Sequence, residues 1–238
     1  MNREPYTIGV LGGMGTYAAI HLFRQYAEVF PAEKEWERPR IIIDNRCTMP
    51  SRVRAALYGE DRDRLIGEMS DSVGNLCRSG CSRILLACNT AHLFLEDIYQ
   101  LVPEAEERIL SIVETCADGL YENEEKEVLL LASEGTIESG IWQKTCRARG
   151  IRCKAPQREE YALLRDCIEA VKRNRYTDAV RAVFLELLHR GPVCVLGCTE
   201  LPLLYERYQG LCSDIVVYDP VLMALARCAG EYREGLKK

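Results

Sequence analysis

Short apolar runs alternate along this chain with stretches in which apolar residues recur at helical spacing. Runs of four to eight apolar, β-branched residues between Gly, Pro or Asn are typical of parallel strands that are buried on both faces. Alternating strands and helices favour an α/β fold with parallel sheets. The pattern predicts strands at Thr7–Leu11, Ile41–Asp44, Arg83–Ala87, Ile109–Ile112, Val128–Ala132, Ile151–Ala155, Val193–Gly197 and Asp214–Tyr218.

Three of the predicted helices have recognisable ends. Apolar residues recur at helical spacing over Leu65–Cys77, and Gly80 is a suitable stop after them. The same spacing recurs over Ala179–Leu188, where Thr177 is a candidate N-cap. The pair Asp219–Pro220 opens a final helix, because proline is favoured in the first helical turn.

The second half of the chain repeats the pattern of the first half. An apolar strand turns through small residues into Gly-Thr in both Ile8–Thr16 and Glu127–Thr136. Another apolar strand ends in Cys, followed by Asn or Thr, in both Ile84–Thr90 and Val193–Glu200. Two similar halves in the same order predict a duplicated α/β domain. Each half would contribute one small-residue loop and one cysteine to a shared cleft.

Composition and charge exclude several classes of protein. The 238 residues have a net charge of −5, so neither nucleic acid nor a membrane surface is an expected partner. No apolar stretch reaches the ~18 residues of a membrane helix, and the chain does not start with a signal-peptide pattern. The twelve cysteines do not follow a disulfide-framework spacing. We therefore expect a cytoplasmic protein with reduced cysteines.

Two of the cysteines, Cys88 and Cys198, stand at the end of an apolar strand where a helix is about to start. Ligands of open α/β sheets bind outside the carboxyl ends of the strands. A helix N-terminus binds carboxylates there and favours a thiolate over a thiol. A lone cysteine is more often core filling, which we expect for the mid-strand Cys194. The paired cysteines instead favour catalysis.

Two thiols on opposite faces of one carbon atom can invert its configuration. One thiolate removes the α-proton, and the opposite thiol delivers a proton to the other face. No cofactor is needed if hydrogen-bond donors stabilise the carbanion-like transition state. Suitable polar groups in the same loops are Asn89, Thr90, Thr136 and Thr199.

Three other kinds of site have weaker support. Gly13–Ala18 matches a degenerate dinucleotide fingerprint, but the acidic residue Asp44 follows at more than the usual spacing. His92 lies four residues after the first strand-end cysteine, as in a Cys–His hydrolase, but a structural role is favoured. The spacings of Cys77–Cys81 and Cys194–Cys198 fit tetrahedral zinc poorly, so we expect no metal.

The segments GVLGGMGT, MPSR, ACNTAH and GCTEL resemble those of the cofactor-independent aspartate/glutamate racemases, most closely the aspartate racemase branch. The resemblance extends from Ile8 to the last helix. It implies two pseudo-symmetric α/β domains with mainly parallel central sheets and the active site in the cleft between them. We place these domains at residues 1–100 plus 216–238 and at residues 101–215. The resemblance also implies Cys88 and Cys198 as the catalytic pair, no cofactor, and a homodimer.

Further site residues are implied by the same resemblance. Arg52 matches the arginine that holds the substrate's side-chain carboxylate, and Lys172 matches a lysine with a similar anchoring role. The positions that line the substrate are matched by Met14, Asn89, Thr90, Thr136 and Thr199.

Three residues depart from the usual pattern of the branch. Thr16 replaces a proline, Ser51 replaces an aspartate before the arginine, and Ser133 replaces a threonine. None of them removes a proposed catalytic group, but they leave the preferred amino acid open. We expect the interconversion of L- and D-aspartate, with glutamate as the next substrate. The alternatives are a related isomerase or decarboxylase of another small carboxylic acid, and a non-catalytic amino-acid-binding protein.

Overall fold

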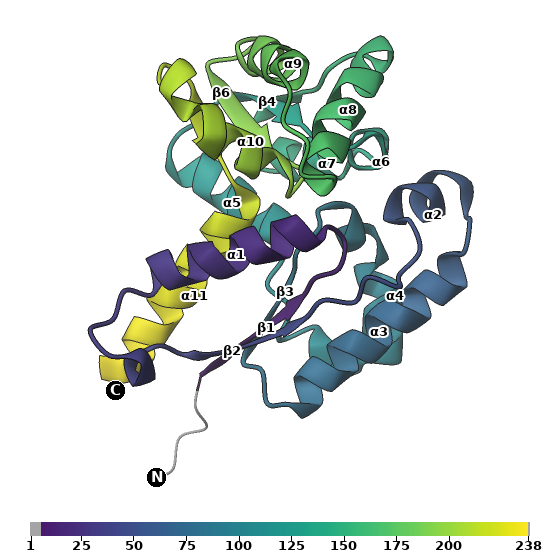
Figure 1. Ribbon diagram of the computed structural model, residues 1–238. Helices are drawn as coiled ribbons and strands as arrows, with labels where there is room; N and C mark the ends of the chain where they lie inside the picture. Colours follow the sequence, from purple (N-terminus) through teal and green to yellow (C-terminus); the bar gives the residue numbers. More distant parts are fainter. Residues whose placement is uncertain (1–5, 238) are drawn as a thin grey trace.

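The chain forms two parallel β-sheets, each flanked by helices (Figure 1). The structure, a computed structural model, describes residues 6–237; residues 1–5 and 238 of the predicted domains lie outside this range. The first sheet has the strand order β2-β1-β3 and the second has the order β5-β4-β6-β7. The strands are β1 (Thr7–Leu11), β2 (Arg40–Asp44), β3 (Arg83–Leu86), β4 (Glu127–Leu131), β5 (Arg152–Lys154), β6 (Val193–Leu196) and β7 (Val216–Tyr218).

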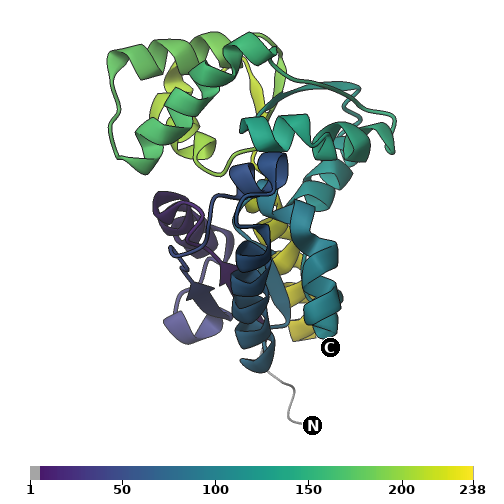
Figure 2. The same ribbon diagram turned by 90° about the vertical axis from the view of Figure 1, so that its right-hand side faces the viewer.

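The helices connect successive strands and cover both sheets (Figures 1 and 2). They are α1 (Thr16–Val29), α2 (Arg52–Tyr58), α3 (Arg62–Arg78), α4 (Leu95–Leu101), α5 (Ile112–Glu122), α6 (Glu134–Glu138), α7 (Ile141–Arg147), α8 (Tyr161–Lys172), α9 (Asp178–Leu188), α10 (Leu201–Tyr208) and α11 (Pro220–Lys237). Along residues 6–237, none of these helices is long and apolar enough to cross a membrane.

The two halves place their cysteines at equivalent points. In the first sheet Leu11 of the central strand β1 pairs with Leu86 of β3. In the second sheet Leu131 of the central strand β4 pairs with Leu196 of β6 in the same way. Each cysteine follows its strand by two residues, so the internal repeat is visible in the register of the sheets. The predicted α/β fold with two similar parallel-sheet halves is confirmed.

The final helix packs against the half that contains the first sheet, although the strand before it belongs to the second sheet. β7 pairs with β6, and α11 then packs against α1 and α5 (Figures 1 and 2). Residues 216–218 thus lie in the second sheet, while our division assigned them to the first domain. The division into residues 1–100 plus 216–238 and residues 101–215 stays a prediction.

One predicted strand is wrong. Ile109 forms only an isolated bridge with Ile84, and α5 already begins at Ile112. The side chain of Ser111 accepts a hydrogen bond from Glu114 N and caps this helix, so the apolar run is divided between a bridge and a helical turn. The apolar pattern did not distinguish the buried first turn of a helix from a strand.

The three predicted helix ends are confirmed. Gly80 follows α3 with a φ of +76°. Thr177 accepts a hydrogen bond from Val180 N at the start of α9. The carboxylate of Asp219 accepts hydrogen bonds from the N–H groups of Val221 and Leu222 at the start of α11. Polar side chains satisfy the free N–H groups of both helix starts, as the sequence predicts.

Candidate active site

The two strand-end cysteines line one cavity of about 70 Å³, which we call the inner cavity. Cys88 reaches it from the first sheet and Cys198 from the second. Both are half-buried, whereas the residues on either side of each are buried. The other lining residues are Met14, Ser51, Arg52, Val53, Asn89, Thr90, Ser133, Ile168, Lys172, Gly197, Thr199 and Glu200.

The backbone turns sharply at both cysteines. The carbonyl of Cys88 accepts a hydrogen bond from Ala91 N, within a short 3-10 helix at Thr90–Phe94. The carbonyl of Cys198 accepts one from Leu201 N, which begins α10. The end of a buried strand and the start of a helix therefore fix each thiol at the edge of its sheet.

Glu200 is a site residue that the sequence analysis missed. It is 2% exposed, and its Oε2 accepts a hydrogen bond of 3.0 Å from the thiol of Cys198. Burial, followed by the charge of Glu200 and this hydrogen bond, raises the pKa of Cys198 well above its ordinary value, and the charge of Cys88 adds to the effect. Burial also raises the pKa of Glu200, which Lys172 and Arg52 oppose.

The glycine-rich loop makes room for this carboxyl group. A Cβ atom at Gly15 would overlap Glu200 Oε1, so any other residue there would displace this carboxylate. The backbone of Gly15 is extended, with a φ of −178°, so the requirement is steric rather than conformational. Glu200 stands in the GCTE motif, but its contact with a loop almost two hundred residues earlier cannot be read from that motif.

Arg52 begins α2 and is held by backbone carbonyls rather than by an acid. Its Nη1 donates to Pro50 O at 2.9 Å, and its Nη2 donates to Met14 O at 3.0 Å. Among the described residues no carboxylate forms an ion pair with it. A guanidinium has five N–H donors in a fixed fork, so several stay free for a bound carboxylate.

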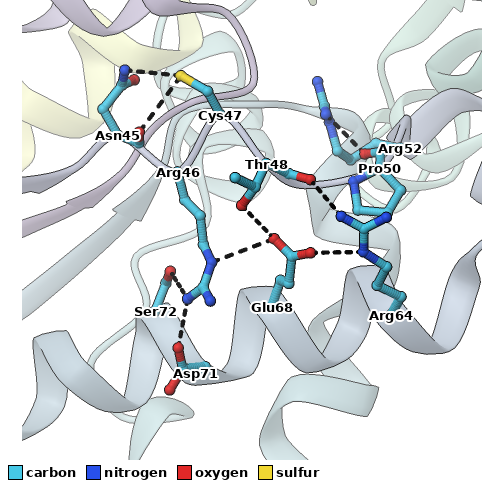
Figure 3. A network of polar contacts seen from close by, with 10 residues as sticks. All are labelled: Asn45, Arg46, Cys47, Thr48, Pro50, Arg52, Arg64, Glu68, Asp71 and Ser72. Carbon is cyan, nitrogen blue, oxygen red and sulfur yellow. Dashed lines mark hydrogen bonds and ion pairs between the residues drawn. The ribbon is translucent and has the colours of Figure 1, made fainter.

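A polar network fixes the loop that precedes Arg52 (Figure 3). Glu68 of α3 accepts hydrogen bonds from Thr48 Oγ1 at 2.7 Å and from Arg64 Nε at 2.9 Å. It also lies 3.4 Å from Arg46 Nε, and the Nη1 of Arg46 reaches Asp71. The network ties the segment between β2 and α2 to α3.

Lys172 ends α8 and lies on the rim of the inner cavity. Its Nζ donates to Glu169 at 3.1 Å, one turn earlier in the helix. Burial alone would lower the pKa of Lys172, but the charges of Glu200, Cys198 and Glu169 outweigh burial and raise it. The ammonium group therefore stays charged beside the cavity.

Hydroxyl groups join the loops of the two halves behind the thiols. Thr90 Oγ1 lies 2.8 Å from Thr136 Oγ1 and 3.2 Å from Ser133 Oγ. Thr199 donates to the carbonyl of Ala87 at 3.3 Å. Thr136 is fully buried and does not line the inner cavity, so its contact with a substrate stays a prediction.

His92 has both of its ring nitrogens engaged by the backbone. Ile112 N donates to Nε2 at 3.3 Å, so Nε2 is unprotonated and Nδ1–H donates to the carbonyl of Cys88 at 3.0 Å. Burial lowers the pKa of His92 to about 4. The neutral ring connects the turn at Cys88 to the start of α5. This supports a structural role for His92 over a role in a Cys–His hydrolase.

The other cysteines of the alternative sites lie in the core. Cys194 is fully buried, and its thiol donates to the carbonyl of Leu188. Cys77 is buried on α3, and Cys81 is buried in the turn between α3 and β3. Within residues 6–237 no cluster of three or more His, Cys, Asp or Glu side chains is arranged to hold a metal ion.

The inner cavity contains unpaired polar atoms of both kinds. Within the described part of the chain, six buried side-chain nitrogen or oxygen atoms have no hydrogen-bond partner. Three of them belong to residues that line the inner cavity, namely Arg52 Nε, Asn89 Nδ2 and Glu200 Oε1.

A larger space adjoins the inner cavity, and we call it the outer chamber. It measures about 450 Å³ and lies between α2, α6 and α8. Its lining includes the charged residues Arg54, Glu134, Arg165 and Glu169. The inner cavity and the outer chamber share the residues Ser51, Val53, Ser133, Ile168 and Lys172.

The chain is similar to known racemases over most of its length. The chain is 26% identical over 220 residues to the broad-specificity amino-acid racemase RacX of Bacillus subtilis. The aligned region covers 89% of this chain and 92% of RacX. The aspartate racemase of Picrophilus torridus has a TM-score of 0.80 and 26% identity, covering 96% of this chain and 98% of that one. The glutamate racemase of Francisella tularensis shares the fold, with a TM-score of 0.69 at 16% identity over 98% of this chain and 82% of that one.

The family model described as Asp/Glu/hydantoin racemase matches residues 11–228, from the end of β1 into α11. This span includes the second sheet, all of the first sheet except residues 7–10 of β1, and every residue of the inner cavity. The protein therefore belongs to the Asp/Glu/hydantoin racemase family, and is an isomerase of the racemase class.

Proposed function

We propose that this protein interconverts L- and D-aspartate, and to a lesser extent glutamate, by a two-base mechanism that uses Cys88 and Cys198. The observation that carries the proposal is that two thiols, one from each sheet, line a single cavity. A racemase needs a proton acceptor on one face of the α-carbon and a proton donor on the other. The similarity to an aspartate racemase of the same family supports this substrate.

Residues that line the inner cavity complement an amino-acid zwitterion. Arg52 and Asn89 carry N–H donors for a carboxylate, and the carboxylate of Glu200 is an acceptor for the α-ammonium group. Lys172 and the free N–H groups of Arg52 provide positive charge for the second carboxylate of an acidic substrate. Met14, Thr90 and Thr199 would shape the remaining wall.

The proposed reaction transfers two protons and needs no redox step. In one direction the Cys88 thiolate takes the α-proton, and the Cys198 thiol gives its proton to the opposite face. In the other direction the roles are exchanged. Charge that develops on the substrate carboxylate is stabilised by the donors of Arg52 and Asn89, which are fixed before the substrate arrives.

Proton NMR of L-aspartate in deuterated water tests this proposal. We expect the α-proton signal to disappear as D-aspartate forms, and we expect both Cys88→Ala and Cys198→Ala to abolish turnover. Cys194→Ala is the matched control, because it removes a core thiol that does not line the inner cavity. If no amino acid exchanges, the related isomerase or decarboxylase becomes the better assignment. Cleavage of an ester that survives Cys198→Ala would favour the hydrolase.

Racemisation of amino acids with longer side chains is a second candidate, which the outer chamber favours. The inner cavity measures only about 70 Å³, whereas the adjoining outer chamber measures about 450 Å³. A substrate whose α-carbon lies between the thiols would extend its side chain into the outer chamber. The similarity to a broad-specificity racemase supports this candidate. Comparable kcat/KM values for aspartate, glutamate and glutamine would establish it, and activity on aspartate alone would exclude it.

We also propose a homodimer. Ile20 and Phe23 lie three residues apart on α1 and are 59% and 51% exposed, which is unusual for two large apolar side chains on one helix face. A second copy would cover them. Light scattering on the wild type and on an Ile20→Glu, Phe23→Glu variant measures the mass directly, and a monomeric wild type would reject the dimer.

A further inference from the structure

The two halves differ at the second position after each cysteine. Thr90 occupies this position in the first half and Glu200 in the second. Thr90 turns away to bond Thr136 and Ser133, whereas Glu200 turns back to accept a hydrogen bond from its own cysteine. The pseudo-symmetric site therefore has two chemically different thiols.

The surroundings of Glu200 keep its carboxyl group against Cys198. Gly15 leaves no side chain in its way, and a Cβ at that position would overlap Oε1. The charged and titratable groups that act on the pair are Lys172 from α8, Arg52 from α2 and Cys88 from the end of β3. Among the described residues no carboxylate forms a hydrogen bond with the thiol of Cys88.

We propose that Glu200 is a catalytic residue that holds the proton on Cys198 in the free enzyme, so that Cys88 is the resting base. The inference rests on the proposed two-thiol function. A thiolate at Cys198 would put a second negative charge 3.0 Å from a buried carboxylate. A thiolate at Cys88 avoids this repulsion, because among the described residues no carboxylate bonds that thiol.

The placement of this proton decides which enantiomer the resting enzyme accepts. The resting enzyme processes the enantiomer whose α-hydrogen faces Cys88: Cys88 gains the α-proton, and Cys198 gives its proton to the opposite face. The product leaves an enzyme with a Cys88 thiol and a Cys198 thiolate beside Glu200. Loss of the Cys88 proton to water and gain of one from water at Cys198 restore the resting form. No other reactant is needed.

Alkylation by iodoacetamide in the absence of substrate tests the inference, because the thiolate is the reactive form. Peptide mass spectrometry measures the labelling of Cys88 and Cys198 at pH 7, with the exposed Cys47 as an internal reference. We expect Cys88 to react at least about tenfold faster than Cys198 in the wild type. In Glu200→Gln, which keeps the shape but removes the charge, the two rates should become similar.

Glu206→Gln is the matched control. Glu206 also lies on α10, but it pairs with the buried His21 and the exposed Arg24, away from the inner cavity. Its labelling ratio should equal that of the wild type. Equal rates for Cys88 and Cys198 in the wild type, or an unchanged ratio in Glu200→Gln, would overturn the inference.

A second measurement covers the case in which Glu200→Gln unfolds, which labelling of the buried Cys116 would reveal. The wild-type labelling rates are then followed from pH 6 to pH 10. A midpoint for Cys198 above that for Cys88 supports the inference, and coincident midpoints overturn it. These readouts need no substrate. If the expected labelling accompanies an absence of exchange with aspartate, the proposed substrate fails while the placement of the proton stands.

Discussion

At the residue scale, the sequence motifs identified the site residues within each loop. They did not identify the contacts between different loops. Cys88, Cys198 and Arg52 are readable from short segments, and the structure brings them to one cavity. Glu200 and Thr136 show what sequence could not give. The position of Glu200 depends on the absence of a side chain at Gly15, and Thr136 is covered by Thr90. The positions of both residues depend on contacts between segments that are far apart in the sequence.

Gly15→Ala should impair catalysis without removing any functional group. The new Cβ would lie 1.9 Å from Glu200 Oε1 and would push that carboxylate away from Cys198. Because the φ of Gly15 suits any residue, the effect on folding should be small. We expect kcat/KM to fall at least about tenfold, since a catalytic group moves by an ångström or more. Gly67→Ala, with open space around it, should keep the wild-type activity.

His92 should make the stability of the fold depend on pH. Its pKa is about 4 in the folded state, below the ordinary 6.5, so the unfolded chain binds more protons between these values. The stabilisation is complete above pH 6.5 and is lost as the pH falls toward 4. It amounts to about 3 kcal/mol. Urea unfolding at pH 7 and pH 4.5 should show a smaller pH effect in His92→Gln, and equal pH effects would contradict the prediction.

At the element scale, the apolar pattern located the strands well and failed where one run serves two elements. Ile109–Ile112 contains a single bridge and the first residue of α5, because Ser111 caps the helix in the middle of the run. The loop before α2 shows the opposite case. No local sequence pattern predicts that this loop is well ordered, since the side chains that fix it come from α3 (Figure 3).

Glu68→Gln should loosen this loop and weaken substrate binding. Glu68 connects Thr48 to Arg64 and Arg46, and the loop leads directly to Arg52. We expect KM for aspartate to rise by about three- to tenfold with little change in kcat, since an anchoring group is displaced rather than a reacting one. Glu28→Gln removes a comparable carboxylate from an exposed pair with Arg24 and should change neither constant. A fall in kcat alone would contradict this assignment.

At the scale of the whole molecule, the internal repeat predicted two equivalent sheets and a site between them. The repeat did not predict which sheet contains the last strand. β7 is too short to show a repeated pattern, and it pairs with β6 at the edge of the second sheet. It also could not show that the halves are joined beside the thiols. Thr90 with Thr136, Asn89 with Trp142, and Thr199 with Ala87 form hydrogen bonds across the junction.

Thr136→Val tests whether this junction sets the geometry of the site. The substitution keeps the shape of a fully buried side chain but removes the hydroxyl that meets Thr90 at 2.8 Å. We expect a loss of about 1–2 kcal/mol in the free energy of unfolding, because the hydroxyl also lies 3.1 Å from Ser133 Oγ and both contacts are lost. We also expect kcat/KM to fall about tenfold, because the two thiols are positioned from opposite halves.

Thr145→Val separates stability from geometry in this test. Thr145 is also buried, but its hydroxyl donates to Glu114 at 3.2 Å, away from the inner cavity. Its loss should lower the free energy of unfolding by a similar amount and leave kcat/KM unchanged. Equal losses of activity in Thr136→Val and Thr145→Val, measured by α-proton exchange and urea unfolding, would show that activity follows general stability. A loss of activity confined to Thr136→Val would mean that the contact between the halves fixes the relative positions of the two thiols.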